Sequence, residues 1–233
     1  FKIKHLDYVY AYKEQIGYVE ITGEVKFPGK YAISSKDRML DLINRSGGYK
    51  SSAYVFGGSL QRDSVKKLEQ TFSDKTYSSL ITFIASNPSA LTGATSGNSF
   101  AYILQELKEF NPVGRIITEF DDTALSENLQ ENIYLNDGDK IHIPPYTPNV
   151  YIFGEVGNPG AVIFKENAKM FDYINQSGGF TRYSSSNFVF VVSPNGETQK
   201  VDIGRFQQLL SQDYEVYPGS VIYVPRHIGK VDG

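Results

Sequence analysis

The chain has 233 residues, of which 40% are apolar and 21% are charged, a composition typical of folded globular proteins and not of disordered ones. Its formal net charge of −3 excludes the strongly basic balance expected of a general nucleic-acid-binding protein. The sequence has no cysteine and three widely separated histidines, His5, His142 and His227, which excludes disulfides, thiol nucleophiles and clustered imidazole or thiolate metal sites.

The N-terminal segment carries an alternating series of tyrosines. Tyr8, Tyr10 and Tyr12 would place their rings on one face of a strand. Such a face is a candidate for glycan contact through stacking on sugar rings, for a subunit interface, or for ordinary packing.

The chain begins with Phe1 rather than Met, which favours a processed product or an excised fragment. No run of 18 apolar residues is present, so the sequence predicts no membrane-spanning helix.

The next segment predicts a hairpin followed by a helix. Residues 23–29 read Gly-Glu-Val-Lys-Phe-Pro-Gly, in which proline fixes φ and glycine permits a positive φ in the turn. Residues 39–48 read Met-Leu-Asp-Leu-Ile-Asn-Arg-Ser-Gly-Gly, a short helix closed by glycines that suit a left-handed C-terminal cap. The motif residues singled out here are Gly23, Glu24, Pro28, Gly29, Gly47 and Gly48.

A long insertion is expected at about residues 60–112. Apolar residues at helical spacing predict a helix over 64–85, and a second helix is expected over 101–110, closed by Asn111 and Pro112. Residues 86–99 are rich in Ser, Gly, Asn and Thr and are interpreted as a loop. The insertion is therefore expected to be a helical hairpin that projects from the first module or packs on it. Arg62 and Arg115 flank it, and ion pairs with Asp or Glu are more probable for them than phosphate or glycan binding.

The segment that closes the first module contains two aspartates. Asp137 and Asp139 stand in Asn-Asp-Gly-Asp before the apolar run at 141–143. A carboxylate pair or a cation site is one interpretation, but a turn between strands is the more probable one. The proline-rich stretch at 144–148 follows and favours an extended, stiff connector.

The chain then repeats itself. Residues 154–179 match residues 23–48 at 12 of 26 positions without a gap, and such self-similarity indicates a duplicated unit. The second set of motif residues is Gly154, Glu155, Pro159, Gly160, Gly178 and Gly179. The end of the first copy also recurs, because 137–144 corresponds to 218–225, although Pro-Gly-Ser replaces Asp-Gly-Asp.

The second copy gives the clearest order of elements. Strands are expected at 150–156 and 161–164, a helix at 167–176 with Asn167 as its N-cap, and a hairpin at 188–192 and 198–203. A short helix near 206–210 and a last strand at 221–224 complete the unit. This order predicts an α+β fold made of two tandem β-grasp-like modules, the first over 1–147 with the helical-hairpin insertion and the second over 148–233.

Glu24 and Glu155 could form a general acid and base pair only if the two modules faced each other closely. Each is expected on a strand before a Pro-Gly turn and occurs once per module, so a structural hydrogen bond or ion pair is the better interpretation. Three aromatic residues after the glycine pairs, Tyr49, Phe180 and Tyr183, are further candidates for glycan contact. No phosphate-binding glycine loop and no nucleophile elbow is present in the sequence.

Taken together, the Gly-Glu-Val and Pro-Gly motifs, the helix ending in Gly-Gly and the closing Gly-Asp-x-Ile-x-Ile-Pro resemble the SLBB (soluble-ligand-binding β-grasp) domain. Tandem SLBB domains occur in bacterial polysaccharide biosynthesis and export proteins. The resemblance implies a periplasmic location, possible association of the parent protein with the outer membrane, and a ring around a capsular or exopolysaccharide in transit. It also implies homo-oligomers, contacts with other export components, and no enzymatic activity, metal or cofactor.

Two other functions stay open on the sequence alone. A free-standing module that captures one small ligand or carbohydrate predicts a monomer with a deep aromatic pocket. An enzyme that processes glycans predicts a cleft with two carboxylates from different modules. An assembly element predicts self-association and apolar patches on the flanks of the modules.

Overall fold

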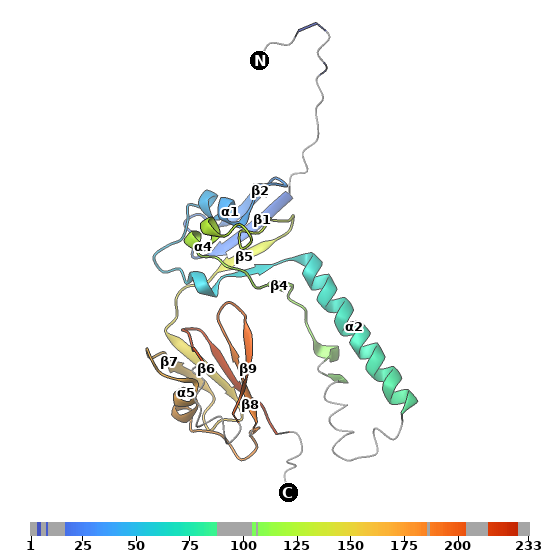
Figure 1. Cartoon of the computed structure of the whole chain (residues 1–233), viewed down its shortest axis with the longest axis vertical. Coiled ribbons are helices and arrows are strands. Elements are labelled where there is room, and N and C mark those ends of the chain that lie inside the picture. The colour runs from blue at the N-terminus through green and yellow to red at the C-terminus, as the bar shows by residue number, and fades with distance from the viewer. Residues whose placement is uncertain are drawn as a thin grey trace.

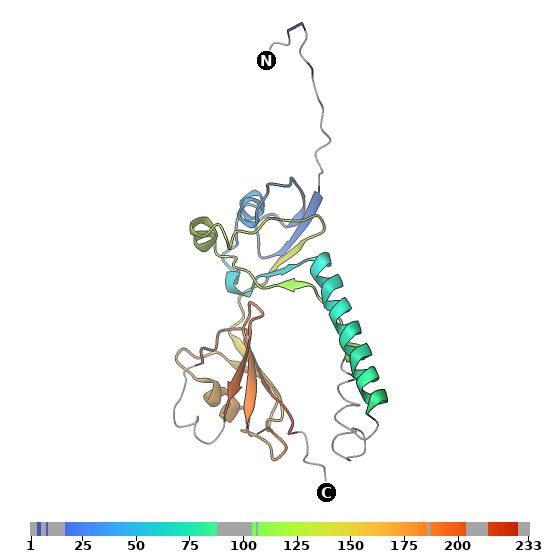
Figure 2. The same cartoon turned by 45° about the vertical axis from the view of Figure 1, so that its right-hand side comes forward.

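The computed structural model describes residues 4–5, 8, 17–87, 104–105, 107–185, 187–203 and 214–227. Two separate five-stranded sheets organise these residues, one in each half of the chain (Figure 1). A short connector joins them, and one long helix leaves the first sheet and runs beside the second in both views (Figures 1 and 2).

The first sheet has the strand order β2-β1-β5-β3-β4. Its strands are β1 (Gly17–Gly23), β2 (Gly29–Ile33), β3 (Ser59–Gln61), β4 (Arg115–Ile116) and β5 (Lys140–Ile143). Helix α1 (Met39–Arg45), the 3-10 turn η1 (Val55–Gly57) and helix α4 (Asp122–Glu127) accompany it. β1 pairs with β2 in antiparallel and with β5 in parallel orientation, which is the central pairing of a β-grasp sheet.

The second sheet has the order β7-β6-β10-β8-β9. Its strands are β6 (Asn149–Gly154), β7 (Gly160–Ile163), β8 (Phe188–Val192), β9 (Thr198–Asp202) and β10 (Val221–Val224), and its helix is α5 (Met170–Gln176). β6 pairs with β7 in antiparallel and with β10 in parallel orientation. The two sheets thus have the same topology, and the predicted α+β fold of two tandem β-grasp modules is confirmed.

Each module buries one face of its sheet under its own helix. Ile21, Ile141 and Leu60 lie side by side across the first sheet and are fully buried with Leu42 of α1. Ile152, Ile222 and Val191 form the matching row in the second sheet, buried against Tyr173 and Ile174 of α5. Alternate side chains of a strand point to opposite faces, so the other face of each sheet is left for other contacts.

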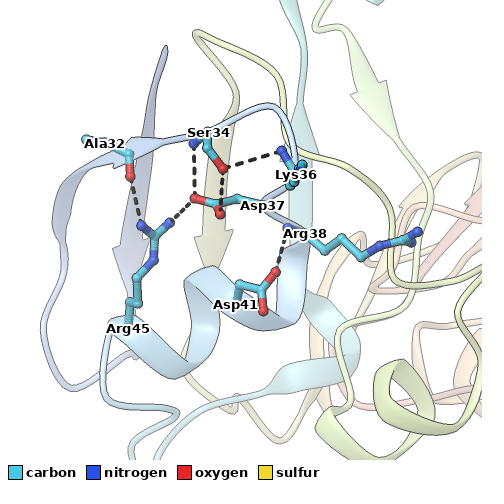
Figure 3. A network of polar contacts seen from close by, with 7 residues as sticks. All are labelled: Ala32, Ser34, Lys36, Asp37, Arg38, Asp41 and Arg45. Atoms are coloured by element: carbon cyan, nitrogen blue, oxygen red, sulfur yellow. Dashed lines mark hydrogen bonds and ion pairs between the residues drawn. The ribbon is translucent and has the colours of Figure 1, made fainter. Parts of the chain in front are cut away.

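A polar network fixes the start of α1 (Figure 3). The Asp41 carboxylate accepts the Arg38 backbone N–H at 2.9 Å, and Asp37 accepts from the backbone and hydroxyl of Ser34. Arg45, in the last turn, donates to the carbonyl of Ala32 at 2.8 Å and pairs with Asp37 at 3.1 Å. The network ties α1 to the end of β2, because Asp37 before the helix and Arg45 in its last turn bind each other and also bind Ser34 and Ala32.

In the second module Asp172 is the counterpart of Asp41, because it accepts the backbone N–H of Lys169, the residue before α5, at 2.8 Å. The expectation that Asn167 caps this helix is therefore wrong. Asn167 instead has a φ of 66°, a left-handed conformation that asparagine tolerates better than most residues.

The turn glycines also differ from the expectation. Gly160 has a φ of 158°, which is extended backbone, and Gly29 is not among the glycines with positive φ. Each of them begins the second strand of its hairpin. The left-handed positions lie before the turn instead, at Gly23 and Gly154.

The insertion replaces the tight turn of one hairpin. In the second module β8 and β9 are joined by residues 193–197, whereas in the first module α2 (Asp63–Ser86) and its return lie between β3 and β4. The 24 residues of α2 give a length of about 36 Å at 1.5 Å per residue. The helix projects from the first module (Figure 2), and residues 104–105 and 107–109 of the expected second helix are helical.

Four expected features lie outside the described residues. They are the strand with Tyr10 and Tyr12, most of the loop at 86–99, part of the second insertion helix and the short helix near 206–210.

Candidate functional site

The duplicated glutamates each form a polar cluster within their own module. Glu24 accepts a hydrogen bond from the Ser52 hydroxyl and lies 3.7 Å from the Lys50 ammonium. Glu155 accepts from the Thr181 hydroxyl at 2.8 Å, and the Arg226 guanidinium lies 3.9 Å away. The expected structural hydrogen bond and ion pair are thus present in both modules.

The hydrogen bond from Ser52, assisted by the charge of Lys50, lowers the pKa of Glu24 below its usual 4.5. We expect Ser52→Ala to raise this pKa toward 4.5, because the charged form loses a donor. Because the pKa of Glu24 is lower in the folded chain than in the unfolded one, the charged carboxylate stabilises the folded state at pH values above the unfolded-state pKa. This stabilisation is lost as the pH falls through the folded-state pKa. Carboxyl-detected NMR titration of the two proteins measures the shift, with the exposed neighbour Ser51→Ala as control. An unchanged pKa in Ser52→Ala would contradict the assignment.

The glycines after both helices adopt the left-handed conformation. Gly47 and Gly48 have φ values of 81° and 78°, and Gly178 and Gly179 have 82° and 72°. The amide of Gly48 donates to the Ile43 carbonyl, and that of Gly179 donates to the Ile174 carbonyl, both at 2.9 Å. These bonds close the ends of α1 and α5 as the sequence predicts.

Two of the aromatic candidates for glycan contact lie beside the cores. Tyr49 and Phe180 occupy equivalent bridges, with Val25 and Val156 respectively, and both rings are half-buried. The Tyr49 hydroxyl donates to the Phe120 carbonyl, and burial raises the pKa of Tyr49 far above its usual value. These surroundings are those of packing residues, so their geometry gives the expected glycan contact no support.

The other tyrosine candidates have different surroundings. The Arg182 and Arg226 guanidinium groups lie 4.6 and 5.1 Å from the centre of the Tyr183 ring. Cations at this distance interact with the ring face, which leaves little of that face for a sugar. Tyr8 is exposed and lies in no strand, while Tyr10 and Tyr12 lie outside the described residues.

The aspartates of the closing turn have structural roles. Asp137 accepts the Tyr18 backbone N–H at 2.7 Å. Asp139 has a side chain that is 0% exposed, and it binds Arg62 through two contacts of 2.9 and 2.7 Å. Within the part of the chain that the structure describes, no group of three His, Cys, Asp or Glu residues is placed to hold a metal ion. These contacts agree with the interpretation of the two aspartates as turn residues. The ion pair expected for Arg62 is present.

The outer faces of the two sheets differ sharply, although their strands correspond residue by residue. The outer face of a sheet is the one turned away from α1 or α5. In the first sheet two adjacent rows on this face are polar: Glu20, Lys140 and Gln61, then Thr22, His142 and Ser59. In the second sheet the equivalent rows are apolar and mostly aromatic: Tyr151, Val221 and Val192, then Phe153, Tyr223 and Phe190.

We call this second set the aromatic face. Phe153 and Tyr223 remain 45% and 42% exposed. The rings of Tyr151 and Phe153 are parallel, with centres 6.5 Å apart. No sequence prediction covered this surface, although the alternation of aromatic residues at 151 and 153 and at 188 and 190 is a signal for it.

Helix α2 carries a second exposed apolar surface. Leu68, Phe72 and Phe83 are 54%, 62% and 50% exposed, and their spacing of 4 and 11 residues puts them on one side of the helix. We call these three residues the α2 stripe. Another side of α2 packs against the returning chain, where the Ser73 hydroxyl donates to the Leu107 carbonyl. Exposed apolar patches of this kind mark interaction surfaces in soluble proteins.

The joint between the modules is held by specific contacts. Pro145 bridges to Ala53, and the Tyr54 and Tyr146 amides donate to the carbonyls of Pro144 and Ser52. Arg115 of β4 donates to the Pro194 carbonyl of the second module at 2.9 Å, and burial lowers the pKa of Arg115. Residues 144–146 of the connector are therefore held by contacts with residues 52–54, which supports the stiff link expected from its prolines.

Aromatic rings from both modules meet at the same joint. Phe56 of η1 contacts Tyr217, with ring centres 4.8 Å apart. A cavity of about 290 Å³ opens beside this pair. No signal in the sequence placed Phe56 against Tyr217, because the two lie 161 positions apart and meet only through the joint.

No helix among the described residues is long and apolar enough to cross a membrane.

Comparison with known proteins agrees with this duplicated architecture. The model of the SLBB domain matches residues 18–62 and 149–202, which run from β1 to the end of β3 and from β6 to the end of β9. Two curated sequences of polysialic acid transport protein KpsD from Escherichia coli are each 33% identical over 92 residues. The similar stretch is 40% of this chain and spans only 16% of the length of those relatives.

Proposed function

We propose that this chain, a member of the proteins with tandem SLBB domains, is a non-catalytic assembly element of a bacterial polysaccharide export protein. The aromatic face is the observation that carries the assembly role, because its positions are polar in the otherwise matching first sheet. The similarity to a polysialic acid transport protein supports the link to polysaccharide export.

A non-catalytic role is supported by the contacts of the duplicated glutamates and of Asp139. Glu24 and Glu155 each bind partners within their own module, and Asp139 is neutralised by Arg62. These groups stabilise turns and strand ends, and none of them is left to transfer a proton to a glycan.

The partner of the aromatic face is the α2 stripe of a second copy. Both surfaces are apolar and exposed, and they lie on different modules of the same chain. A contact between unlike surfaces of two copies is heterologous, and such contacts close into rings when the rotation between copies allows it. A ring of this kind in the periplasm, as part of an outer-membrane-associated exporter of capsular or exopolysaccharide, would surround the glycan and dock with other export components.

Glycan contact in such a passage is weak and distributed, because a tight site would stall the polymer. The alternative is a free-standing module that captures one small soluble ligand or carbohydrate, and the cavity at the joint is the observation that favours it. A capture module is a monomer at all concentrations, whereas the assembly element associates.

Sedimentation velocity over a concentration series tests the assembly role. We expect the wild-type chain to self-associate, and we expect Phe72→Asp to weaken association at least about tenfold, because a charge would be buried in an apolar contact. Ser78→Asp introduces the same charge at an exposed position off the stripe and is expected to leave association unchanged. A wild-type monomer at the highest concentrations, or equal effects of the two substitutions, would contradict the proposal.

A further inference from the structure

The cavity at the joint is built from both modules. It has a volume of about 290 Å³, and its lining includes Phe56, Glu197, Gln199, Tyr214, Glu215 and Tyr217. Phe56 comes from η1 of the first module, whereas the other five come from the edge strand β9, its hairpin turn and the segment before β10. Its volume lies just below the range of about 300–1,000 Å³ found for pockets of drug-sized ligands, so the cavity suits one sugar ring rather than an oligosaccharide.

Three rings give this cavity its apolar surface. The rings of Phe56 and Tyr217 are tilted by 55° and touch at a centroid distance of 4.8 Å, and Tyr214 lines the same space. Aromatic rings offer faces with a negative quadrupole, which attract the slightly positive C–H groups on the flat side of a pyranose.

The polar part of the lining combines two carboxylates, Glu197 and Glu215, with the neutral side chains of Ser193 and Gln199. Glu197 and Glu215 are exposed at the mouth, and the Glu215 carboxylate accepts the Tyr217 hydroxyl. This hydrogen bond, together with burial, raises the pKa of Tyr217, so the phenol stays neutral. None of the described residues that line the cavity is basic. A carboxylate accepts hydrogen bonds from hydroxyl and ammonium groups and repels another carboxylate.

We propose that this cavity is a subsite for a single sugar unit that carries hydroxyl or ammonium donors and no carboxylate. The inference rests on the proposed function, since it assigns a place and a chemical class to the weak glycan contact. It implies that the glycan handled by this chain has neutral or amino sugars at the contacting positions, unlike the acidic units named for the KpsD relatives. Because Phe56 and Tyr217 come from different modules, the subsite depends on the contact between the modules at the joint.

The test is NMR titration of the 233-residue chain with glucosamine, glucose and glucuronate. We expect saturable binding of the first two with dissociation constants on the order of 1–10 mM, the weak range that suits a passing polymer. We expect glucuronate to bind at least about tenfold more weakly, because it brings a carboxylate next to two others. The amide shifts should cluster around Gln199, Glu215 and Tyr217.

Variants separate the aromatic contribution from the charge contribution. Tyr214→Ala and Phe56→Ala are expected to weaken binding of all sugars by at least about threefold. Glu215→Gln is expected to reduce the preference against glucuronate while glucose binding changes little. Tyr18→Ala, which removes an exposed ring from the first sheet, is the matched control and is expected to change nothing.

Equal affinity for glucuronate and glucosamine, shifts that map away from the cavity, or no saturable binding of any sugar would overturn the subsite. Self-association is measured independently by sedimentation. Loss of the subsite with intact association therefore rejects only this inference, whereas absence of association rejects the proposed function.

Discussion

Gly154→Ala is expected to destabilise the second module by about 3 kcal/mol or more, since it combines a left-handed backbone with a collision against main chain. Gly154 has a φ of 88°, and an added Cβ would lie 2.0 Å from the Val224 carbonyl oxygen. That oxygen belongs to β10, which pairs with β6 in the centre of the sheet. Gly23 repeats the arrangement in the first module, with a φ of 85° and the Ile143 oxygen at 2.0 Å.

The two helix-ending glycines provide the control. Gly48 and Gly179 have similar φ values of 78° and 72°, but an added Cβ meets nothing within 4 Å. Their replacement by alanine is expected to cost only about 1–2 kcal/mol, the price of the left-handed conformation alone. Urea unfolding of the four variants measures both losses, and equal losses at Gly154 and Gly179 would show that the contact with Val224 does not matter.

The buried pair of Arg62 and Asp139 gives the second large effect. Arg62→Ser is expected to destabilise the first module by about 3–5 kcal/mol, because it leaves the fully buried Asp139 carboxylate without its counter-charge. Arg62 also donates to the Tyr134 carbonyl at 2.9 Å, so this more exposed hydrogen bond is lost as well.

The second module shows how the same site is filled without charge. By strand register, Ser193 and Ser220 take the places of Arg62 and Asp139, and both are buried. The Ser220 hydroxyl accepts the Tyr217 amide at 3.0 Å, as Asp139 accepts the Asn136 amide at 2.8 Å. We therefore expect the double substitution Arg62→Ser with Asp139→Ser to recover more than half of the loss. A double-mutant cycle in urea measures the coupling, and additive losses would contradict it.

Most of the fold could be predicted from the sequence, because the duplicated copies give two independent patterns for each element that they share. The hairpin at 188–192 and 198–202 and the last strand at 221–224 lie where their residue patterns put them. The predicted N-cap of α5 was wrong because asparagine is a residue type that favours this position. The helix instead begins after Lys169, whose backbone N–H is accepted by Asp172 at the third helical position. Helix α4 was not predicted, although Asp121 is a typical N-cap and accepts the amides of Thr123 and Ala124.

The candidate surfaces were less accessible to sequence reasoning. The aromatic face depends on which strands lie side by side, and the neighbours of β10 are separated from it by up to 70 positions. The cavity depends on contacts between modules, which local patterns do not encode. The candidates Tyr49 and Phe180 follow the glycine pairs in the sequence, and the bridges to Val25 and Val156 explain that position by packing.

The most direct measurement of copy-to-copy assembly uses the absence of cysteine from the chain. Phe72→Cys in the α2 stripe and Tyr223→Cys in the aromatic face are prepared as separate proteins, mixed, and oxidised mildly. The account predicts a disulfide-linked dimer that contains one of each variant, in excess over either variant linked to itself. A mixture that gives only statistical or no cross-links, or a double variant that closes its disulfide within one chain, would contradict the contact between copies.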